Sequence, residues 1–111
     1  MNPGELNCRA IIQRATETRD NEGHLAVTYD DHIYLWAKIQ AITARSRDSY
    51  VEQNFETLTR ITIRYRDDVF MTDRIKYGSR IFAQIGPPIN LGEKNAYLRL
   101  ECREIVEKKH G

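Results

Sequence analysis

Residues of the types that bind metals or carry catalysis are sparse in this chain, and they are poorly grouped. The three histidines, His24, His32 and His110, are widely separated in the sequence. The closest approach to a ligand set is Asp30-Asp31-His32, whereas metal sites combine several ligands at short, recurring spacings. We therefore interpret this triplet as a solvated strand end and expect no metal site.

Motifs for nucleophilic or phosphate chemistry are missing as well. No serine stands in a Gly-x-Ser-x-Gly elbow, and no glycine-rich loop has the pattern of a phosphate cradle. The adjacent acids Asp67 and Asp68 are more typical of a strand end than of two carboxyl groups that share a proton. We expect no catalytic residue and no cofactor, and we predict that the protein is not an enzyme.

Arginines interleaved with aromatic residues suggest a second kind of chemistry, the binding of single-stranded nucleic acid. Small barrels bind such strands by stacking bases on aromatic rings beside basic side chains. Acidic residues lie among these positions, however, and the formal net charge of the chain is only +1. We favour a solvated or protein-binding face and keep an oligonucleotide-binding (OB-type) barrel as the alternative. The residues concerned are Arg60, Arg64, Arg66, Arg80, Arg99 and Arg103, with Trp36, Phe82 and Tyr97.

The same aromatic side chains also suggest a protein interface. On the outer face of a monomer they would leave apolar area in contact with water, which is unfavourable unless a partner covers it. Tyrosine, tryptophan and arginine are the residue types enriched at interface hot spots. The candidates for interface contacts are Trp36, Phe82, Tyr97 and Arg64.

The two cysteines, Cys8 and Cys102, each fall near the centre of a predicted strand, and neither has the spacing of a metal ligand. We predict free, buried thiols, as is usual in a reducing compartment. A disulfide between the first and last strands would be possible if those strands paired, but folding does not require it.

The composition indicates one folded domain spanning residues 1–111. Hydrophobic residues make up 41% of the chain and charged residues 30%, which is too apolar for a disordered chain and too charged for a membrane protein. The longest purely apolar runs are of three or four residues, so we expect no membrane contact. The N-terminal residues lack the pattern of a secretory signal, and we expect the protein in the cytoplasm.

Alternating apolar and polar residues, separated by turn residues, predict β-strands along most of the chain. In the clearest early strand, one face is apolar and is formed by Ile33, Leu35, Ala37, Ile39 and Ala41. Ile61, Ile63 and Tyr65 share one face of a later strand, and Gly78-Ser79 marks the clearest hairpin, in which Ile81, Ala83 and Ile85 align. The predicted strands span 7–16, 25–30, 33–42, 59–66, 73–77, 80–86 and 96–106.

Residues 43–58 break this alternation, and we predict a long flexible loop there, of the kind that is often functional. A single open sheet of this size would leave one apolar face bare. We therefore predict an all-β fold, a small antiparallel β-barrel of six to seven strands with one long internal loop.

The order of these segments resembles that of the phage head-closure (head–tail joining, head completion or stopper) proteins. The first half carries Ile11-Ile12-Gln13-Arg14, a turn with Asp20 and Gly23, and Leu35-Trp36-Ala37-Lys38-Ile39. The second half carries the blocks Thr59–Arg66, Asp73–Phe82 and Ala96–Cys102. The resemblance covers about residues 6–105.

The resemblance implies a structural protein of a phage or prophage that assembles in the host cytoplasm and stays in the virion at the head–tail interface. Family members add a ring, generally of twelve copies, below the adaptor protein on the portal, close the channel over the packaged DNA and present the surface to which tail proteins attach. In stopper members, the loop between the third and fourth strands reaches into the channel. The corresponding loop is 43–58, although its start, Thr43-Ala44-Arg45-Ser46, departs from the family's usual small-Gly-Arg-Glu run. The candidates for lining the channel are Arg45, Arg47, Tyr50 and Phe55.

Overall fold

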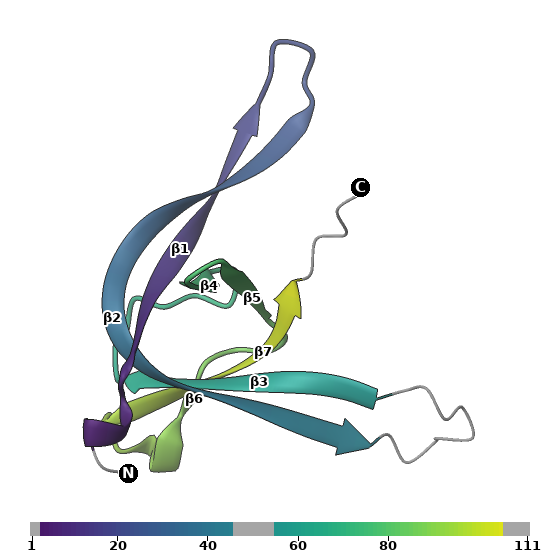
Figure 1. The fold of residues 1–111 in the computed structure, drawn as a ribbon. Helices are drawn as coiled ribbons and strands as arrows, with labels where there is room; N and C mark the ends of the chain where they lie inside the picture. The colour runs from purple at the N-terminus through teal and green to yellow at the C-terminus, as the bar shows by residue number, and fades with distance from the viewer. Residues whose placement is uncertain (1–2, 46–54, 106–111) are drawn as a thin grey trace.

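A computed structural model describes residues 3–45 and 55–105 of the chain. These residues form seven β-strands and two single-turn 3-10 helices (Figure 1). In chain order the elements are η1 (Pro3–Glu5), β1 (Cys8–Arg19), β2 (Leu25–Arg45), β3 (Phe55–Arg64), β4 (Arg74–Tyr77), β5 (Arg80–Gln84), β6 (Ile89–Asn90), η2 (Leu91–Glu93) and β7 (Tyr97–Ile105).

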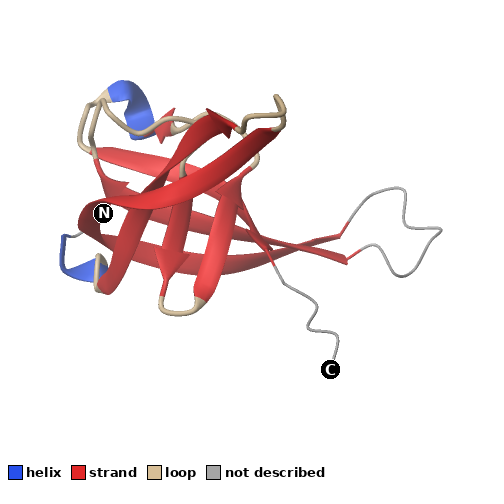
Figure 2. Cartoon of the chain, turned by 90° about the horizontal axis from the view of Figure 1, so that it is seen from above, coloured by secondary structure: helices blue, strands red, loops and turns tan. Residues whose placement is uncertain are grey.

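The strands pair antiparallel in the order β3-β2-β1-β4-β5-β7-β6, and an additional pairing of β3 with β7 closes the sheet on itself. β3 pairs over long stretches with both of its neighbours. It pairs with β2 from Ala37↔Ile63 to Arg45↔Phe55, and with β7 from Leu58↔Arg103 to Arg64↔Tyr97. Figure 2 shows the strands wrapping around a common interior. The predicted all-β class and the small closed antiparallel architecture are confirmed.

The interior is filled by side chains from almost every strand. Most of the predicted inward residues of β2 and β3 point to it, namely Ile33, Leu35, Ala37 and Ile39 of β2 and Ile61 and Ile63 of β3. The fully buried apolar side chains are Ala10, Ile12, Ala37, Ile61, Ile63, Ile75, Phe82, Leu100 and Cys102. Burial of apolar area at about 25 cal/mol per Å² is the main force that holds such a barrel closed.

Phe82 was predicted on the outer face, and this prediction is wrong: its side chain is 0% exposed. The cause is the two-residue turn Gly78-Ser79, which sets the register Tyr77↔Arg80 and Ile75↔Phe82. Residues that pair directly across two strands lie on the same face of the sheet. Since Ile75 points into the barrel, Phe82 does too, and Ile81, Ala83 and Ile85 do not form the inner row.

Two other predicted inward residues, Ala41 and Tyr65, are exposed. Ala41 lies on β2 beyond Ala37, where β1 stops pairing with β2, so that edge of β2 is uncovered. Tyr65 follows the last residue of β3 and is 37% exposed. Conversely, Thr62, which alternates with the inward Ile61 and Ile63, is also buried. It pairs with Lys38 of β2 and with Arg99 of β7.

The predicted segments 25–30 and 33–42 belong to one strand, β2, which has a β-bulge between them. Ile12 pairs with Ile33 and the next residue, Gln13, pairs with Asp31, so His32 is the extra residue on β2. A bulge bends a strand and increases its twist. In Figure 1 the curve of β2 carries its first half away from the barrel, together with β1.

Two ribbons therefore project from the barrel (Figure 1). In the first, β1 and β2 pair only with each other beyond Gln13, the last residue of β1 that contacts β4. In the second, β2 and β3 pair only with each other from Thr43↔Thr57 to Arg45↔Phe55. The predicted loop 43–58 is therefore strand at both of its ends, and residues 46–54 lie outside the described part of the chain. The radius of gyration, 16.0 Å, exceeds the roughly 13 Å expected of a compact chain of this length.

Candidate protein-interaction surface

Two of the predicted interface residues, Trp36 and Arg64, line the same surface hollow. The hollow has a volume of about 350 Å³ and lies where β2 and β3 separate, just beyond their last pair, Ala37↔Ile63. Trp36 is 52% exposed and Tyr65 is 37% exposed, which is unusual for rings of this size. We call this site the Trp36 hollow; it is lined by Leu35, Trp36, Arg64, Tyr65 and Arg66.

Cations surround the aromatic rings of the Trp36 hollow. Arg9 of β1 pairs with Trp36 in the strand register, and its guanidinium carbon lies 5.3 Å from the centre of a Trp36 ring. Arg66 donates two hydrogen bonds, of 2.9 and 3.0 Å, to the carboxylate of Asp68, and these hydrogen bonds lower the pKa of Asp68. Exposed rings beside guanidinium groups are the typical make-up of an interface hot spot.

The remaining predicted interface residues have different positions. Tyr97 is half-buried and pairs with Arg64 in the register of β3 and β7, so it lies next to the Trp36 hollow. Tyr34, another outward aromatic residue of β2, is 59% exposed, and its hydroxyl donates a hydrogen bond of 3.3 Å to Asp31. Phe82 belongs to the core and is no longer a candidate.

The arginines that suggested nucleic-acid binding mostly have carboxylate partners. Arg60 and Arg99 both lie 3.4 Å from Glu101, and Arg80 lies 2.8 Å from Glu104. The side-chain hydrogen bonds from Arg80 lower the pKa of Glu104. Neutralising pairs of this kind reduce the positive charge that a phosphate backbone would require.

The first ribbon carries an apolar strip that the sequence analysis missed. Leu25 and Val27 are 55% and 46% exposed, and with Tyr29 they alternate along one face of β2. This strip leads to a second hollow of about 320 Å³ at the base of the ribbon, where Val27 and Tyr29 face Met71 and Arg74. The alternation of residues 25, 27 and 29 was visible in the sequence. Only the structure shows that Leu25 and Val27 on this face stay about half exposed.

A buried ion pair holds the base of the first ribbon. Asp73 is 1% exposed; it accepts hydrogen bonds from Arg14 Nε (3.1 Å) and Nη2 (3.0 Å) and from the backbone N–H of Phe70 (2.9 Å). The hydrogen bond to Asp73 raises the pKa of Arg14, whose guanidinium also lies 4.2 Å from the ring centre of Phe70. Gln84 Nε2 donates to the carbonyl oxygens of Phe70 and Asp73. These contacts fasten the loop before β4 to the ribbon.

Two of the four predicted channel residues belong to described strands. Arg45 is the last residue of β2 and Phe55 the first residue of β3, while Arg47 and Tyr50 fall in 46–54, outside the described residues. The side chains of all four also fall outside the described part of the chain. Their role in a channel stays a prediction.

Other chemical sites were sought among residues 3–45 and 55–105. No group of three or more metal-binding side chains occurs in these ranges. Asp31, from the triplet considered as a ligand set, accepts hydrogen bonds from Gln13 and Tyr34. No helix in the described ranges is long and apolar enough to cross a membrane.

The prediction of free thiols is confirmed, but only Cys102 is fully buried and Cys8 is half-buried. The first strand, β1, does not pair with the last, β7, so the disulfide considered for these strands is not formed. Burial raises the pKa of the Cys102 thiol to about 12.

Comparison with known proteins gives two kinds of match. Residues 1–105 match the family described as phage head completion protein. A protein from Shigella flexneri 2a, whose structure was determined in solution, is 32% identical with a TM-score of 0.72, covering 97% of this chain and 100% of that chain. A chain from the virion of a native gene transfer agent particle has the same fold at 20% identity, with a TM-score of 0.69 and coverage of 92% and 97%. No curated protein matches the chain.

Proposed function

The chain belongs to the phage head completion protein family, and on that premise we propose that it forms a ring at the head–tail junction, closes the DNA channel after packaging and presents the attachment surface for the tail. The family match over residues 1–105 carries the proposal, since it spans the barrel and both ribbons. The similar chain from a gene transfer agent virion supports it, because that chain is part of an assembled particle.

Exposed apolar surface supports a role in assembly. A free monomer presents Trp36, Tyr34, Leu25 and Val27 to water, each about half exposed. Patches of this kind mark protein–protein interaction sites on soluble proteins. The proposed partners are further copies of the chain, in a ring of about twelve, with the adaptor protein above and the tail proteins below.

Weak self-association fits this role better than a ring that forms alone. We expect the purified protein to be monomeric and to assemble in the host cytoplasm only on the adaptor ring. A template that already holds neighbouring copies raises their effective concentration, so weak contacts between copies are sufficient. A tight ring formed by the purified protein in the absence of the adaptor would contradict this expectation.

The channel-closing element in the proposal is segment 43–58. The two described ends of this segment form the second ribbon, from Thr43↔Thr57 to Arg45↔Phe55, and lie outside the β3–β7 register. Basic side chains are suited to contact the phosphates of DNA in a channel, and aromatic side chains can line its wall. Arg45, Arg47, Tyr50 and Phe55 remain the residues proposed for this contact.

Deletion of the gene from the phage or prophage that carries it tests the proposed function. Electron microscopy of the induced lysate should show separate tails beside tailless heads that have lost their DNA, and a plasmid copy of the gene should restore complete particles. Normal infectious particles from the deletion strain would contradict the proposal.

The channel-closing role needs its own variant. The deletion strain is supplied with a chain in which Arg45, Arg47, Tyr50 and Phe55 are replaced by alanine. We expect heads that incorporate the chain but retain less DNA than heads with the natural chain. Full DNA retention with normal incorporation would remove these four residues from the proposal while leaving the head–tail role intact.

A further inference from the structure

We propose that the first ribbon of one copy docks into the Trp36 hollow of the next copy, so that the chain associates with itself head to tail. This inference rests on the proposed function and specifies the contact between copies that a ring requires. Two surface features of the same chain lead to it: an unsupported ribbon with an apolar strip, and an aromatic hollow rimmed by arginines.

The ribbon has no cover of its own. Every residue from 16 to 28 is exposed, although this segment is hydrogen-bonded β-structure except at its turn. A two-stranded ribbon that stands alone in water is marginally stable. One of its faces carries Leu25 and Val27, opposite Arg19 and Glu17 in the register. An apolar surface on the ribbon indicates that a partner packs against it.

The Trp36 hollow has complementary features. Its lining includes the apolar and aromatic residues Leu35, Trp36 and Tyr65, and its volume of about 350 Å³ is enough for one or two aliphatic side chains. Arg64 and Arg66 line it, Arg66 being paired with Asp68, and Arg9 lies over Trp36. A segment that binds there should present aliphatic side chains beside carboxylates.

The ribbon presents that combination. Segment 16–31 holds five carboxylates and only one arginine, namely Glu17, Asp20, Glu22, Asp30 and Asp31 against Arg19. Glu17 pairs with Val27 and so lies on the apolar face of the ribbon. Opposite charges on two surfaces favour encounter and fix the register of binding.

The ribbon cannot fill the hollow of its own chain. Leu25 and Leu35 are ten residues apart on the same strand, β2, which at about 3.3 Å per residue corresponds to roughly 33 Å of strand length. Figure 1 shows the tip of the ribbon far from the junction of β2 with β3. The occupant of the hollow is therefore the ribbon of another copy.

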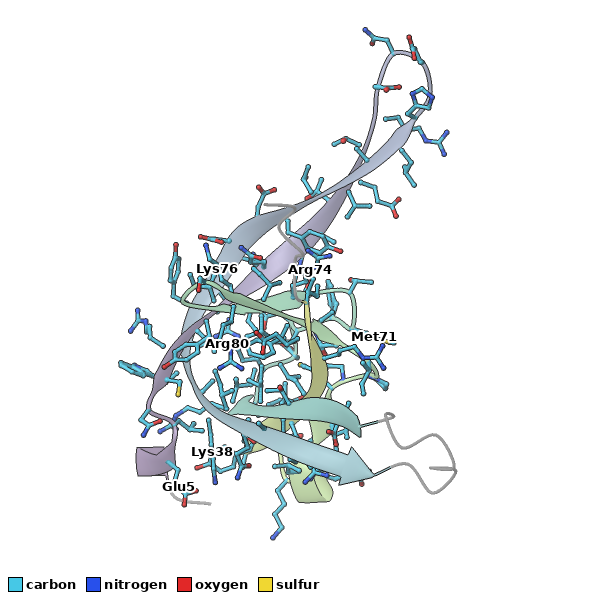
Figure 3. The ribbon with its side chains drawn as sticks, turned by 45° about the vertical axis from the view of Figure 1, so that its right-hand side comes forward. Glu5, Lys38, Met71, Arg74, Lys76 and Arg80 are labelled. Carbon is cyan, nitrogen blue, oxygen red and sulfur yellow. The ribbon has the colours of Figure 1, made fainter. Side chains whose placement is uncertain are left out.

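The two surfaces lie on different walls of the barrel, which determines the symmetry of the contact. The Trp36 hollow lies between β2 and β3. The apolar strip of the ribbon leads instead to the hollow at the base of the ribbon, which Arg74 of β4 and Ala83 of β5 help to line. Figure 3 labels Arg74 and Met71 at this second hollow. A contact between two different surfaces is heterologous, and repeated heterologous contacts close into a ring when the rotation allows it. Each copy then uses its ribbon on one side and its hollow on the other.

Cysteine cross-linking in assembled particles tests this contact. In a Cys8→Ser background, Leu25→Cys and Tyr65→Cys are introduced singly and together, and particles are treated with a short bismaleimide. We expect a ladder of covalent oligomers from the doubly substituted chain and monomers from each single variant. Thr18→Cys, on the opposite face of the ribbon, is the matched control, and combined with Tyr65→Cys it should give much weaker bands.

The outcomes separate this inference from the proposed function. Cross-linking of the single Leu25→Cys variant would indicate ribbon-to-ribbon contact and overturn the inference. Particles that contain the doubly substituted chain but give no ladder would also overturn it while leaving the head–tail role in place. Absence of the natural chain from particles would overturn the proposed function, and the inference with it.

Charge exchange between copies provides a second measurement. We expect Arg64→Glu to reduce incorporation into particles about tenfold or more, because it places a carboxylate opposite the acidic ribbon. Adding Glu17→Arg to the same chain should restore a large part of the incorporation, since each contact then joins opposite charges again. Lys94→Glu makes the same charge change at a residue beside η2 that does not line the hollow, and it should have a much smaller effect. An Arg64→Glu chain that assembles normally would overturn the inference.

Discussion

Asp73 is the single side chain on which the base of the first ribbon most depends. It is buried, and its carboxylate accepts three hydrogen bonds, two from Arg14 and one from the backbone of Phe70. A buried charge is tolerated in a protein when such partners surround it. The contacts join β1 to the loop before β4, two segments that are far apart in the sequence.

Replacement of Asp73 by alanine should lower the free energy of unfolding by about 3 kcal/mol, because it leaves the Arg14 guanidinium and the Phe70 N–H without their acceptor. Urea denaturation followed by circular dichroism would measure the change. Asp68→Ala is the matched control: its ion pair with Arg66 is about 40% exposed on both sides, so we expect a loss below about 1 kcal/mol. Equal losses in the two variants would show that the burial of Asp73 has little effect.

The two thiols should differ in reactivity. Cys102 is 0% exposed and burial raises its pKa to about 12, so at neutral pH it is an inaccessible thiol with a negligible thiolate fraction. Cys8 is half-buried. With Ellman's reagent, we expect one thiol per chain to react in the folded protein and two in guanidinium chloride. Rapid reaction of both thiols under native conditions would be inconsistent with the core position of Cys102.

At the scale of elements, the β4–β5 hairpin shows how a local turn decides the content of the core. Gly78 has φ +61°, in the left-handed region that glycine adopts without strain. With Ser79 it forms the two-residue connection that places Phe82 opposite Ile75. A longer or shorter turn would change this pairing, and a shift by one residue would move Phe82 out of the core.

Gly78→Ala should cost about 1 kcal/mol of folding stability, because a residue with a Cβ is strained at this backbone angle. Nothing lies within 4 Å of the added Cβ, so the loss would come from the backbone alone. Gly86→Ala is the control, since its φ lies outside that region and its added Cβ is equally free of contacts; we expect it to be neutral. Thermal denaturation of both variants would measure the difference.

The two ribbons differ from the barrel in what stabilises them. In the barrel, apolar side chains from almost every strand fill one interior. In the first ribbon, the main contacts are backbone pairing and the hydrogen bonds of the turn. There the carboxylate of Asp20 accepts hydrogen bonds from the backbone N–H groups of Glu22 and His24. We therefore expect amide hydrogen exchange to be fast in the ribbon and slow in β3 and β7 of the free protein.

This expectation can be measured by hydrogen–deuterium exchange with mass spectrometry. Peptides covering 16–28 should exchange early in the purified protein and become protected in assembled particles, where the ribbon has a partner. Unchanged exchange of these peptides on assembly would indicate that the ribbon stays free in the ring.

At the scale of the whole molecule, acid should destabilise the fold. The pKa values of Asp20, Asp68 and Glu104 all lie below their ordinary values: Asp20 through the backbone N–H of His24, Asp68 through Arg66 and Glu104 through Arg80. A carboxyl group whose pKa is lower in the folded than in the unfolded state stabilises the fold above its unfolded pKa. This stabilisation is lost as the pH falls through the folded pKa.

We therefore expect the melting temperature to fall as the pH is lowered below about 4, where unperturbed carboxyl groups begin to protonate. Differential scanning calorimetry at constant ionic strength would follow it. The double variant Asp20→Asn, Glu104→Gln should melt lower at pH 7. Its melting temperature should also depend less on pH between about 4.5 and 2.5, where ordinary carboxyl groups protonate. A variant with the same pH dependence as the natural chain would show that these pKa shifts do not contribute.

The sequence by itself determined the local structure and the family. Alternation within a strand and turn residues between strands depend on a few neighbouring residues. For this reason most of the barrel strands, the Gly78-Ser79 hairpin and the inward positions of Ile33, Leu35, Ala37 and Ile39 were predicted correctly. The ordered set of these patterns also indicated the family that residues 1–105 match. The exposed positions of Trp36 and Arg64 followed from the same alternation.

Only the tertiary structure decided which distant residues meet. Three features depend on the register between strands. They are the closure of β3 on β7, the extra residue His32 in β2, which had been predicted as two strands, and the position of Phe82 opposite Ile75. The Trp36 hollow exists because β2 and β3 separate at one point, and the first ribbon is exposed because β4 stops pairing at Gln13. Period-two alternation specifies which residues share a face of one strand, whereas pairing and closure specify which faces are covered.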